Sequence, residues 1–306
     1  MSTRRHKKRY NIKDCAFYNI NTKKKLAKIL QISESALKDI LRDEYLYIRK
    51  WKHKKEDRWI SEEPKGSDVD IFRPIDIPSP KLKAVQSRIA NLLSRIETPP
   101  YLFSPVKGRS YVDNARLHIG ARAFWMLDIE NYFPSCSVNN VAHLFHKRMN
   151  CSPDVTAILI KILTLNGSLP QGSPCSPILA FLSNEPMWNE IARIVNDAGC
   201  TLSVYADDIT ISGNHVSGAM IWQVKQCVHR HGMKIKAKKE HCLIYSAAEI
   251  TGVIVTENKT LIPNRKLLEL TNLKEERIRT ANKKERAVLD RRIAGRRAQR
   301  RQVENH

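Results

Sequence analysis

The sequence has no apolar run long enough to cross a bilayer, which needs roughly twenty consecutive apolar residues. It opens on a basic stretch, Met-Ser-Thr-Arg-Arg-His-Lys-Lys-Arg, that lacks the apolar core of a signal peptide. Its seven cysteines form no C-x-x-C pair and are an odd number, so neither a disulfide framework nor a zinc site is expected. These absences predict a cytoplasmic protein with reduced thiols and no membrane association.

Acidic residues are scarce beside basic ones. The 306 residues include 53 Lys and Arg against 31 Asp and Glu, which gives a formal net charge of +22. Such an excess indicates a polyanionic partner, and without a membrane segment nucleic acid is the better candidate. The apolar content is ordinary, so we expect a folded chain with a real core.

The most informative stretch is residues 201–213, Thr-Leu-Ser-Val-Tyr-Ala-Asp-Asp-Ile-Thr-Ile-Ser-Gly. Two runs of alternating apolar and polar residues predict a β-hairpin with Asp207 and Asp208 at or beside its tight turn. Adjacent carboxylates repel each other when they are partly buried, and a divalent cation relieves that cost. A polar turn in which Asp suits the backbone is the alternative.

A third carboxylate follows the apolar run Ala123-Phe-Trp-Met-Leu-Asp-Ile, which predicts a buried strand ending at Asp128. Asp128 could also be a helix cap, because a turn into a helix follows it. Three carboxylates at one sheet edge could hold two cations about 4 Å apart. That arrangement favours metal-dependent nucleotidyl transfer, which needs little beyond positioning and charge neutralisation.

The rest of the chain predicts an α/β (α+β) protein. Residues 1–60 are basic and predicted to be helical, and their aromatic residues among cations suit either single-stranded nucleic acid or an ordinary helix face. Proline and glycine predict a loop with short extended pieces over residues 61–80. Apolar periodicity predicts further helices over 81–96, 137–150, 153–165, 178–196 and 217–231 and from 265 onward.

Three motifs, in order, resemble the reverse transcriptases. Tyr205-Ala-Asp-Asp208 is similar to their catalytic box, and Asp128 in Leu-Asp-Ile-Glu-Asn-Tyr-Phe is similar to their first metal-binding box. Leu169-Pro-Gln-Gly-Ser-Pro-Cys-Ser-Pro177 resembles the loop beside the incoming nucleotide. Order and spacing agree over roughly residues 70–255, most of the chain.

Two further boxes narrow the resemblance to bacterial retron reverse transcriptases. Asn114-Ala-Arg-Leu-His118 fits their N-A-x-x-H box, and Ile250-Thr-Gly252 is similar to their V-T-G box. The resemblance implies a right-hand fold: a basic helical extension (1–60), fingers (61–122), a palm (123–255, with a fingers insertion around 137–175) and a short basic thumb (256–306).

The resemblance also implies an activity and its partners. Retron enzymes copy a structured non-coding RNA from dNTPs, and they prime from the 2′-OH of an internal guanosine. The product is a branched RNA–DNA hybrid (msDNA), and many retrons act with an effector protein in antiphage defence. Another bacterial reverse transcriptase, of the diversity-generating or unclassified defence type, stays an alternative. A silent RNA-binding scaffold for an effector is another.

Residue roles follow from the same resemblance. Mg²⁺, as two ions, would be bound by Asp128, Asp207, Asp208 and the carbonyl of Ile129. Lys239 would protonate the leaving pyrophosphate, although Lys238 could replace it, because the usual Asn-x-x-Lys-Thr pattern is altered to Lys236-Ala-Lys-Lys-Glu240. The expected nucleotide-binding residues are Arg73, Phe133 as steric gate, Gln171, and Tyr205 at the primer end. A solvated arginine is the alternative for Arg73, and a core aromatic is the alternative for Phe133.

RNA contacts are expected at two places. Asn114 and His118 form the retron-specific box, where His118 is equally compatible with a structural histidine. The C-terminal Arg296, Arg297, Arg300 and Arg301 belong to a segment dense in arginine, suited to gripping RNA phosphates or to forming a disordered tail.

Overall fold

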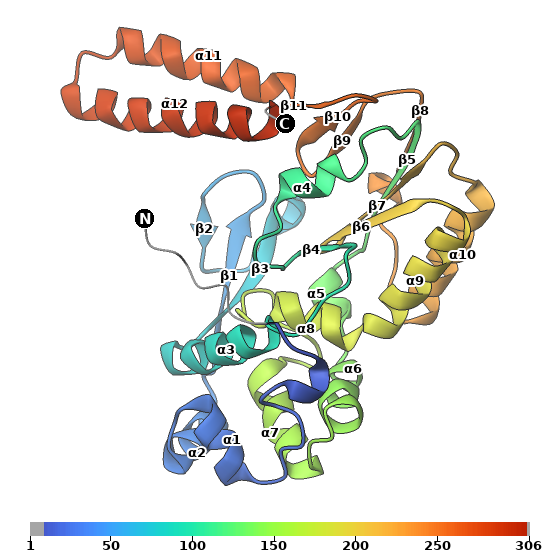
Figure 1. Cartoon of the computed structure of the whole chain (residues 1–306). Coiled ribbons are helices and arrows are strands. Elements are labelled where there is room, and N and C mark those ends of the chain that lie inside the picture. Colours follow the sequence, from blue (N-terminus) through green and yellow to red (C-terminus); the bar gives the residue numbers. More distant parts are fainter. Residues whose placement is uncertain (1–8, 305–306) are drawn as a thin grey trace. The chain divides into compact units, whose positions relative to one another are not determined.

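The computed structural model describes residues 9–304, which fold into two compact units. The first unit contains the chain up to Pro99, Glu130–Trp188 and His231–Met233. The second contains Pro100–Ile129, Asn189–Arg230 and the chain from Lys234 onward. Both units mix helices with sheets (Figure 1), which confirms the predicted α/β (α+β) class. The bounds predicted for fingers, palm and thumb stay a prediction.

The first unit starts with two short helices, α1 (Lys23–Leu30) and α2 (Glu34–Arg42). The hydroxyl of Ser33 accepts a hydrogen bond from the amide of Ala36, which caps the free N-terminus of α2. Each helix buries an apolar face, Leu26, Ala27 and Leu30 in the first case. The predicted helices at this point of the sequence are therefore present.

A three-stranded antiparallel sheet follows, with the order β2 (Trp59–Ile60), β1 (Tyr47–His53), β3 (Phe72–Pro78). The prediction of helix up to residue 60 was therefore wrong for the segment from Tyr47 onward. β1 pairs with β3 at all seven of its positions. Its aromatic and β-branched residues favour a strand, and this pairing between distant segments outweighs the helix preference of its lysines.

Helices make up the rest of the first unit. They are α3 (Pro80–Leu93), α5 (Tyr132–Ser135), α6 (Val138–His143), continued by a π-helical turn at Leu144–Arg148, α7 (Pro153–Leu163) and α8 (Ser176–Ser183). The single helix predicted over 178–196 is in fact two, α8 and α9 (Glu185–Asp197). Helix α8 ends at Ser183, and the side-chain amide of the next residue, Asn184, donates a hydrogen bond to the carbonyl of Ala180.

The second unit is built on a five-stranded sheet of order β4-β6-β7-β5-β8 (Figure 1). Its strands are β4 (Leu102–Ser104), β5 (Ala123–Asp128), β6 (Thr201–Tyr205), β7 (Asp208–Gly213) and β8 (His241–Ile244). The β4–β6 pair is parallel and the other pairs are antiparallel. One face of the β6–β7 hairpin carries Leu202, Val204, Ile209 and Ile211, all buried. The period of two therefore places smaller polar residues on the other face.

A smaller sheet, β9 (Ala248–Ile250), β10 (Val253–Val255) and β11 (Thr260–Leu261), packs with the short helix α4 (Tyr111–Arg116). A capping box starts α4, since Ser110 and Asp113 satisfy each other's amides. Val112 and Ala115 of this helix join Ile250 and Val253 in one apolar cluster. This cluster fixes α4 beside the turn between β9 and β10.

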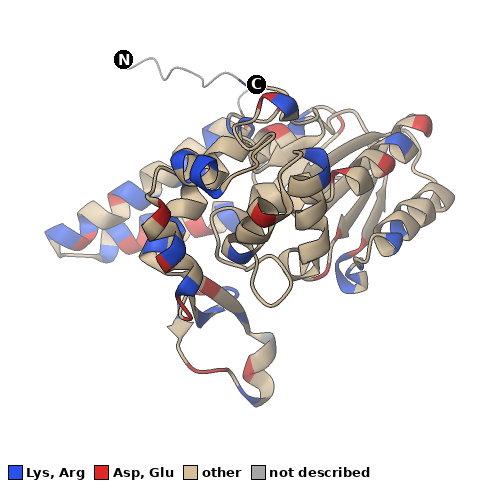
Figure 2. Ribbon diagram, turned by 90° about the horizontal axis from the view of Figure 1, so that it is seen from below, with Lys and Arg blue, Asp and Glu red and all other residues tan. Residues whose placement is uncertain are grey.

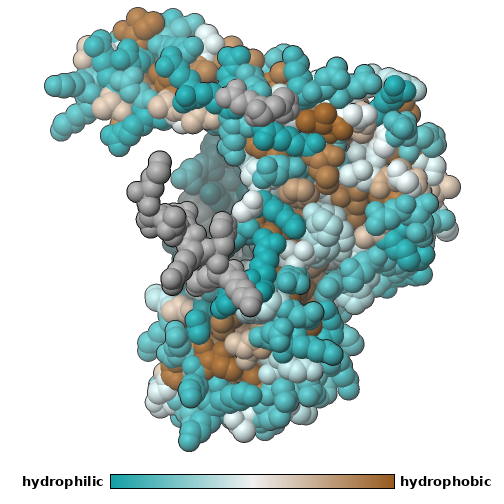
Figure 3. All heavy atoms as spheres, viewed as in Figure 1, coloured by the Kyte–Doolittle hydropathy of each residue, from teal (hydrophilic) through white to brown (hydrophobic). Residues whose placement is uncertain are grey.

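The remaining helices of the second unit are α10 (Gly218–Arg230), α11 (Asn264–Arg279) and α12 (Lys283–Glu304). The last two form an antiparallel hairpin around Leu270, Leu273, Leu289 and Ile293. Lys and Arg are spread along both helices (Figure 2), and mostly hydrophilic side chains cover the hairpin in the space-filling view (Figure 3). No helix within residues 9–304 is both long and apolar enough to span a bilayer.

Candidate active site

The aspartates converge at one end of the five-stranded sheet. β5 ends at Asp128 and β7 begins at Asp208, and these two residues are directly paired across neighbouring antiparallel strands. Asp207 lies in the two-residue connection between β6 and β7, and its carbonyl accepts a hydrogen bond from the amide of Ile129. The predicted hairpin is present, with both aspartates at its turn. Because paired residues in such a ladder have neighbouring side chains, the backbone itself brings the carboxylates together.

The turn that carries Asp207 is strained. Ala206 has a φ of +58°, in the left-handed region that favours glycine. A residue with a Cβ pays roughly 1–2 kcal/mol there. The ladder on either side holds it, because Tyr205 pairs with Asp208 and Val204 with Ile209. The hairpin therefore sets the direction of Asp207 through backbone pairing.

The charges of this cluster interact strongly. Asp128 is 4% exposed, whereas Asp208 keeps an exposed surface. Partial burial, and then the negative charges of Asp207 and Asp128, raise the pKa of Asp208 to about 6. Packed carboxylates that oppose each other's ionisation are a suitable donor set for a hard divalent cation, which removes the repulsion on binding. The residues present therefore fit a metal site.

Lys239 contacts this cluster directly. Its Nζ lies 2.5 Å from Oδ2 of Asp128. Burial lowers the pKa of Lys239, but the hydrogen bond to Asp128 and the charges of the three aspartates outweigh it, so the pKa is raised overall. The altered pattern Lys236-Ala-Lys-Lys-Glu240 thus presents Lys239 to the aspartates. The role of Lys239 as proton donor, with Lys238 as the alternative, stays a prediction.

Glu240 anchors the turn that presents Lys239. A 3₁₀ turn spans Ala237–Lys239, and the amide of Lys236 donates to the carbonyl of Asp128 at 2.8 Å. The carboxylate of Glu240 accepts from Lys225 of α10 at 2.6 and 2.7 Å and from Nε1 of Trp125 at 2.8 Å. The residue that departs from the family pattern therefore has its own anchoring contacts on β5 and α10.

The expected nucleotide-binding residues lie in different places. Tyr205 closes β6 next to the aspartates. Arg73, Phe133 and Gln171 belong to the first unit. Arg73 is exposed on β3 opposite Lys52. Phe133 lies in α5, and the centroid of its ring is 5.6 Å from the centroid of the Tyr132 ring. Their contacts with a nucleotide stay predictions.

The loop carrying Gln171 packs closely against β3. The amide of Asp76 donates to the carbonyl of Gln171 at 2.8 Å. Gly172, at φ +146°, is so close that an added Cβ would lie 2.3 Å from the carbonyl oxygen of Asp76. The side chain of Asp76 in turn accepts from Nε of Arg49 at 2.7 Å. This strand therefore fixes the path of the loop through backbone contact.

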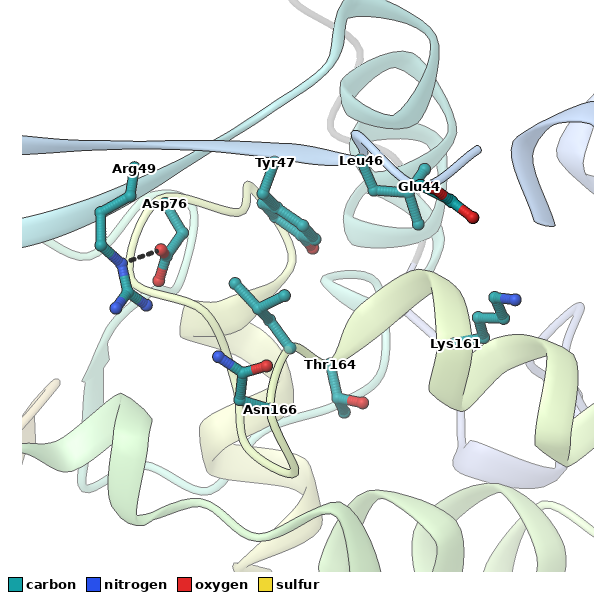
Figure 4. A pocket seen from close by; sticks show the side chains of 9 residues that line it. Glu44, Leu46, Tyr47, Arg49, Asp76, Lys161, Thr164 and Asn166 are labelled. Carbon is teal, nitrogen blue, oxygen red and sulfur yellow. Dashed lines mark hydrogen bonds and ion pairs between the residues drawn. The ribbon is translucent and has the colours of Figure 1, made fainter. Parts of the chain in front are cut away.

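The Arg49–Asp76 pair forms one wall of a pocket of about 480 Å³ in the first unit. Figure 4 shows the two side chains directed toward each other from β1 and β3. Lys161, Thr164 and Asn166 come from the end of α7 and the loop after it. No local pattern in the sequence indicates this pairing, because Arg49 and Asp76 are 27 positions apart.

Asn114 and His118 are both buried, each 1% exposed. Asn114 donates to Oγ1 of Thr251 at 3.4 Å, so the N-A-x-x-H box contacts the Ile250-Thr-Gly252 box. His118 bonds Ser212 and Ser203. Both side chains contact protein, so this geometry favours the structural interpretation of His118 over direct RNA contact.

The C-terminal arginines lie on α12, so residues 295–304 are helical and not a disordered tail. Arg296 bonds Glu269 of α11 at 2.6 Å, and Arg300 bonds Glu304 at 2.7 Å. Arg297 and Arg301 are exposed. The sequence did not separate these two pairs. The acidic partners of Arg296 and Arg300 could have indicated the difference. Glu304 lies four residues after Arg300, and Glu269 lies on α11.

Comparison with known proteins gives a consistent picture. The pattern of the family described as Reverse transcriptase (RNA-dependent DNA polymerase) matches residues 54–255. Retron Se72 reverse transcriptase of Salmonella heidelberg (strain 579083-10) is 36% identical over 147 residues, 46% of this chain and 38% of that protein. Retron Ec86 reverse transcriptase of Escherichia coli is 30% identical over 213 residues, 68% of this chain and 66% of that protein. The matches thus cover less than two thirds of either relative.

Proposed function

The chain belongs to the reverse transcriptase (RNA-dependent DNA polymerase) family, and from this premise we propose that it is an RNA-directed DNA polymerase that copies RNA from dNTPs. The observation that carries the proposal is the pairing of Asp128 with Asp208 beside Asp207, with Lys239 bonded to Asp128. This family's right-hand fold of fingers, palm and thumb accommodates the observed mixture of helices and sheets.

Reverse transcriptase domains use divalent metal ions. We propose two Mg²⁺ ions here, held by Asp128, Asp207 and Asp208, with the carbonyl of Ile129 as a further ligand. When bound, they supply a Lewis acid for the attacking hydroxyl and charge neutralisation for the triphosphate. The primer hydroxyl would lose its proton to solvent as its oxygen bonds the α-phosphorus, while the bond from the α-phosphorus to the pyrophosphate oxygen breaks.

The other residues of the proposed site orient the substrates or protonate the leaving group. Lys239 gives its proton to the leaving pyrophosphate oxygen, a role that suits an ammonium already held beside the aspartates. Tyr205 supports the primer end, while Arg73 and Gln171 contact the nucleotide. Phe133 excludes a ribose 2′-hydroxyl by its ring.

We further propose that the enzyme is of the retron type. Its template is then a structured non-coding RNA, primed from an internal 2′-hydroxyl, and its product is a branched RNA–DNA hybrid (msDNA). Two observations support this: similar proteins are named retron reverse transcriptases, and Asn114 contacts Thr251 between the two boxes of the retron pattern. An effector protein and a role in antiphage defence belong to the same proposal.

The decisive experiment is to purify the protein expressed from its native locus and extract its nucleic acid. Treatment with RNase, DNase and debranching enzyme should reveal a small DNA joined to RNA through a 2′–5′ bond, absent from an Asp208→Asn preparation. Unbranched DNA would point to another type of bacterial reverse transcriptase. Bound RNA without DNA, together with no dNTP incorporation on any primed template, would contradict polymerase activity and favour the scaffold.

A further inference from the structure

We propose that His118 is a positioning residue of the polymerase site: its buried ring ties β6 to β7 and so holds the turn that carries Asp207 and Asp208. The inference rests on the proposed function, because it assigns a role in DNA synthesis. It also gives the N-A-x-x-H box a structural role within the protein, as distinct from a contact with RNA.

The two hydrogen bonds of the ring carry the argument. Nε2 lies 2.7 Å from Oγ of Ser203 on β6, and Nδ1 lies 2.7 Å from Oγ of Ser212 on β7. The two serines are not register partners, since Ser203 pairs with Thr210 and Ser212 with Thr201. The ring therefore links the hairpin diagonally, across two rungs of the ladder. A diagonal link resists sliding of one strand along the other.

The ring lies on the face of the sheet that carries a catalytic aspartate. Side chains alternate along a strand, so Ser212, Thr210 and Asp208 point to the same side of β7. The opposite side of the hairpin carries the buried apolar residues Ile209 and Ile211. The serines and His118 thus form a buried polar contact on the face of Asp208. A shift of this contact would reach the aspartate through only four residues of strand.

The chemistry of the contact suits a neutral imidazole. One ring nitrogen donates and the other accepts, while each serine hydroxyl can do either, so both bonds are satisfied in either tautomer. Burial lowers the pKa of His118 to about 4, so the ring is uncharged at neutral pH. Ser203 and Ser212 are each 1% exposed, so loss of the ring would leave two buried hydroxyls in need of partners.

Helix α4 holds His118 in place from the other side. His118 follows the end of α4, and Thr251 Oγ1 donates to the carbonyl of Tyr111 at 2.9 Å. Nδ2 of Asn114 donates to the same Thr251 oxygen. The N-A-x-x-H box therefore connects the β9–β10 turn, which Asn114 contacts, to the β6–β7 hairpin, which His118 contacts.

The test compares His118→Phe, which fills the ring volume without hydrogen bonds, with His118→Gln, which keeps a donor and an acceptor. His229→Gln on the exposed end of α10 is the control. Synthesis is measured on poly(rA) with an oligo(dT) primer, which needs no cognate RNA. Cognate RNA affinity and amide hydrogen exchange over residues 203–212 are measured in parallel.

For His118→Phe we expect kcat to fall about tenfold to a hundredfold. The Mg²⁺ concentration for half-maximal rate should rise roughly tenfold, as for other residues that orient metal ligands. Exchange in the hairpin should be faster, and RNA affinity should stay within about twofold of wild type. His118→Gln should recover part of the rate, and the control should match wild type.

Three results would overturn the proposal. One is unchanged poly(rA) synthesis with weakened cognate RNA binding, which would make the box an RNA-recognition element. Another is unchanged hairpin exchange in His118→Phe. If His118→Phe does not fold, Ser203→Ala and Ser212→Ala are each combined with His118→Gln in double-mutant cycles. The third result that would overturn the proposal is then that the effects of these substitutions on kcat are additive. Should wild type make no DNA on any template, polymerase activity has failed, while hydrogen exchange still decides whether His118 holds the hairpin.

Discussion

At the scale of single residues, the site combines carboxylates that destabilise one another with one cation that compensates for them. Asp208 has a raised pKa because of partial burial and the charges of Asp207 and Asp128. Lys239 bonds Asp128 and offsets part of the repulsion. Such a cluster lowers stability without a metal and is retained for binding one. Replacing one carboxylate should therefore affect function and stability in opposite directions.

We expect Asp208→Asn to abolish DNA synthesis while leaving RNA affinity nearly intact, because it removes a metal ligand and no RNA contact. Mg²⁺ should raise the melting temperature of wild type and not that of the variant, since a ligand stabilises only the state that binds it. Primer extension, RNA titration and thermal melting in Mg²⁺ and in EDTA measure these effects. Asp154→Asn, which removes the same charge from the start of α7, is the control. Normal synthesis by Asp208→Asn would contradict the metal assignment.

His118 makes a separate prediction about pH. Its pKa is lowered by burial from 6.5 to about 4 in the folded protein. Between these values the unfolded chain binds the proton and the folded one does not, so the free energy of unfolding falls as pH falls from 6.5 toward 4. The decrease attributable to this residue is at most about 3 kcal/mol. Denaturant titrations of wild type and His118→Gln should converge as the pH falls. Parallel pH curves would contradict the neutral buried ring.

At the scale of secondary-structure elements, local patterns predicted what local forces determine. The β6–β7 hairpin was predictable because alternating residues flank Ala206 and Asp207, and the structure has this turn. β1 was missed because its lysines favour helix, whereas its pairing with β3 is an interaction between distant segments. The break at Asn184 was missed although Pro186, two residues further on, is a local signal for a helix boundary. Local patterning thus found the aspartates, and non-local contacts decided what surrounds them.

The same limit applies to the anchors of the site. Glu240 looked like a departure from the family pattern, and nothing nearby in sequence predicts its bonds to Lys225 and Trp125. The serines that bond His118 were visible as polar positions on one side of an otherwise apolar hairpin. That pattern could have indicated a buried polar partner, but it does not name the partner.

The close contact of β3 with the Gln171 loop gives a prediction at this scale. Gly172→Ala places a methyl group against the carbonyl of Asp76 and should displace Gln171, raising the KM for dNTP about tenfold or more. Gly167→Ala is the matched control: it also has positive φ, at +78°, but nothing lies within 4 Å of its added Cβ. Steady-state kinetics at varied dNTP separate KM from kcat. Equal kinetics for the two variants would mean that backbone strain, and not the clash, governs the loop.

At the scale of the whole molecule, the basic side chains behind the net charge of +22 are not all equally available to bind phosphates. In the α11–α12 hairpin, Arg277 pairs with Asp290 and Arg296 with Glu269, so part of the positive charge holds the two helices together. Arg297 and Arg301 are exposed and take part in none of the ion pairs described for residues 9–304. Net charge alone predicts nucleic-acid affinity, whereas ion pairing predicts which charges supply it.

This distinction can be measured through salt dependence. If Arg297 and Arg301 bind phosphates, the double variant Arg297→Gln, Arg301→Gln should bind cognate RNA more weakly. The slope of log affinity against log salt should then fall in magnitude by about 1.4, because each phosphate on a single strand that is no longer neutralised accounts for about 0.7. Arg296→Gln, Arg300→Gln removes the same charge from arginines already paired with Glu269 and Glu304. It should change the slope less and lower the melting temperature more, because it breaks ion pairs within the protein. Equal slopes for the two double variants would show that the hairpin acts only through its total charge, and an unchanged slope in both would exclude α12 from the RNA interface.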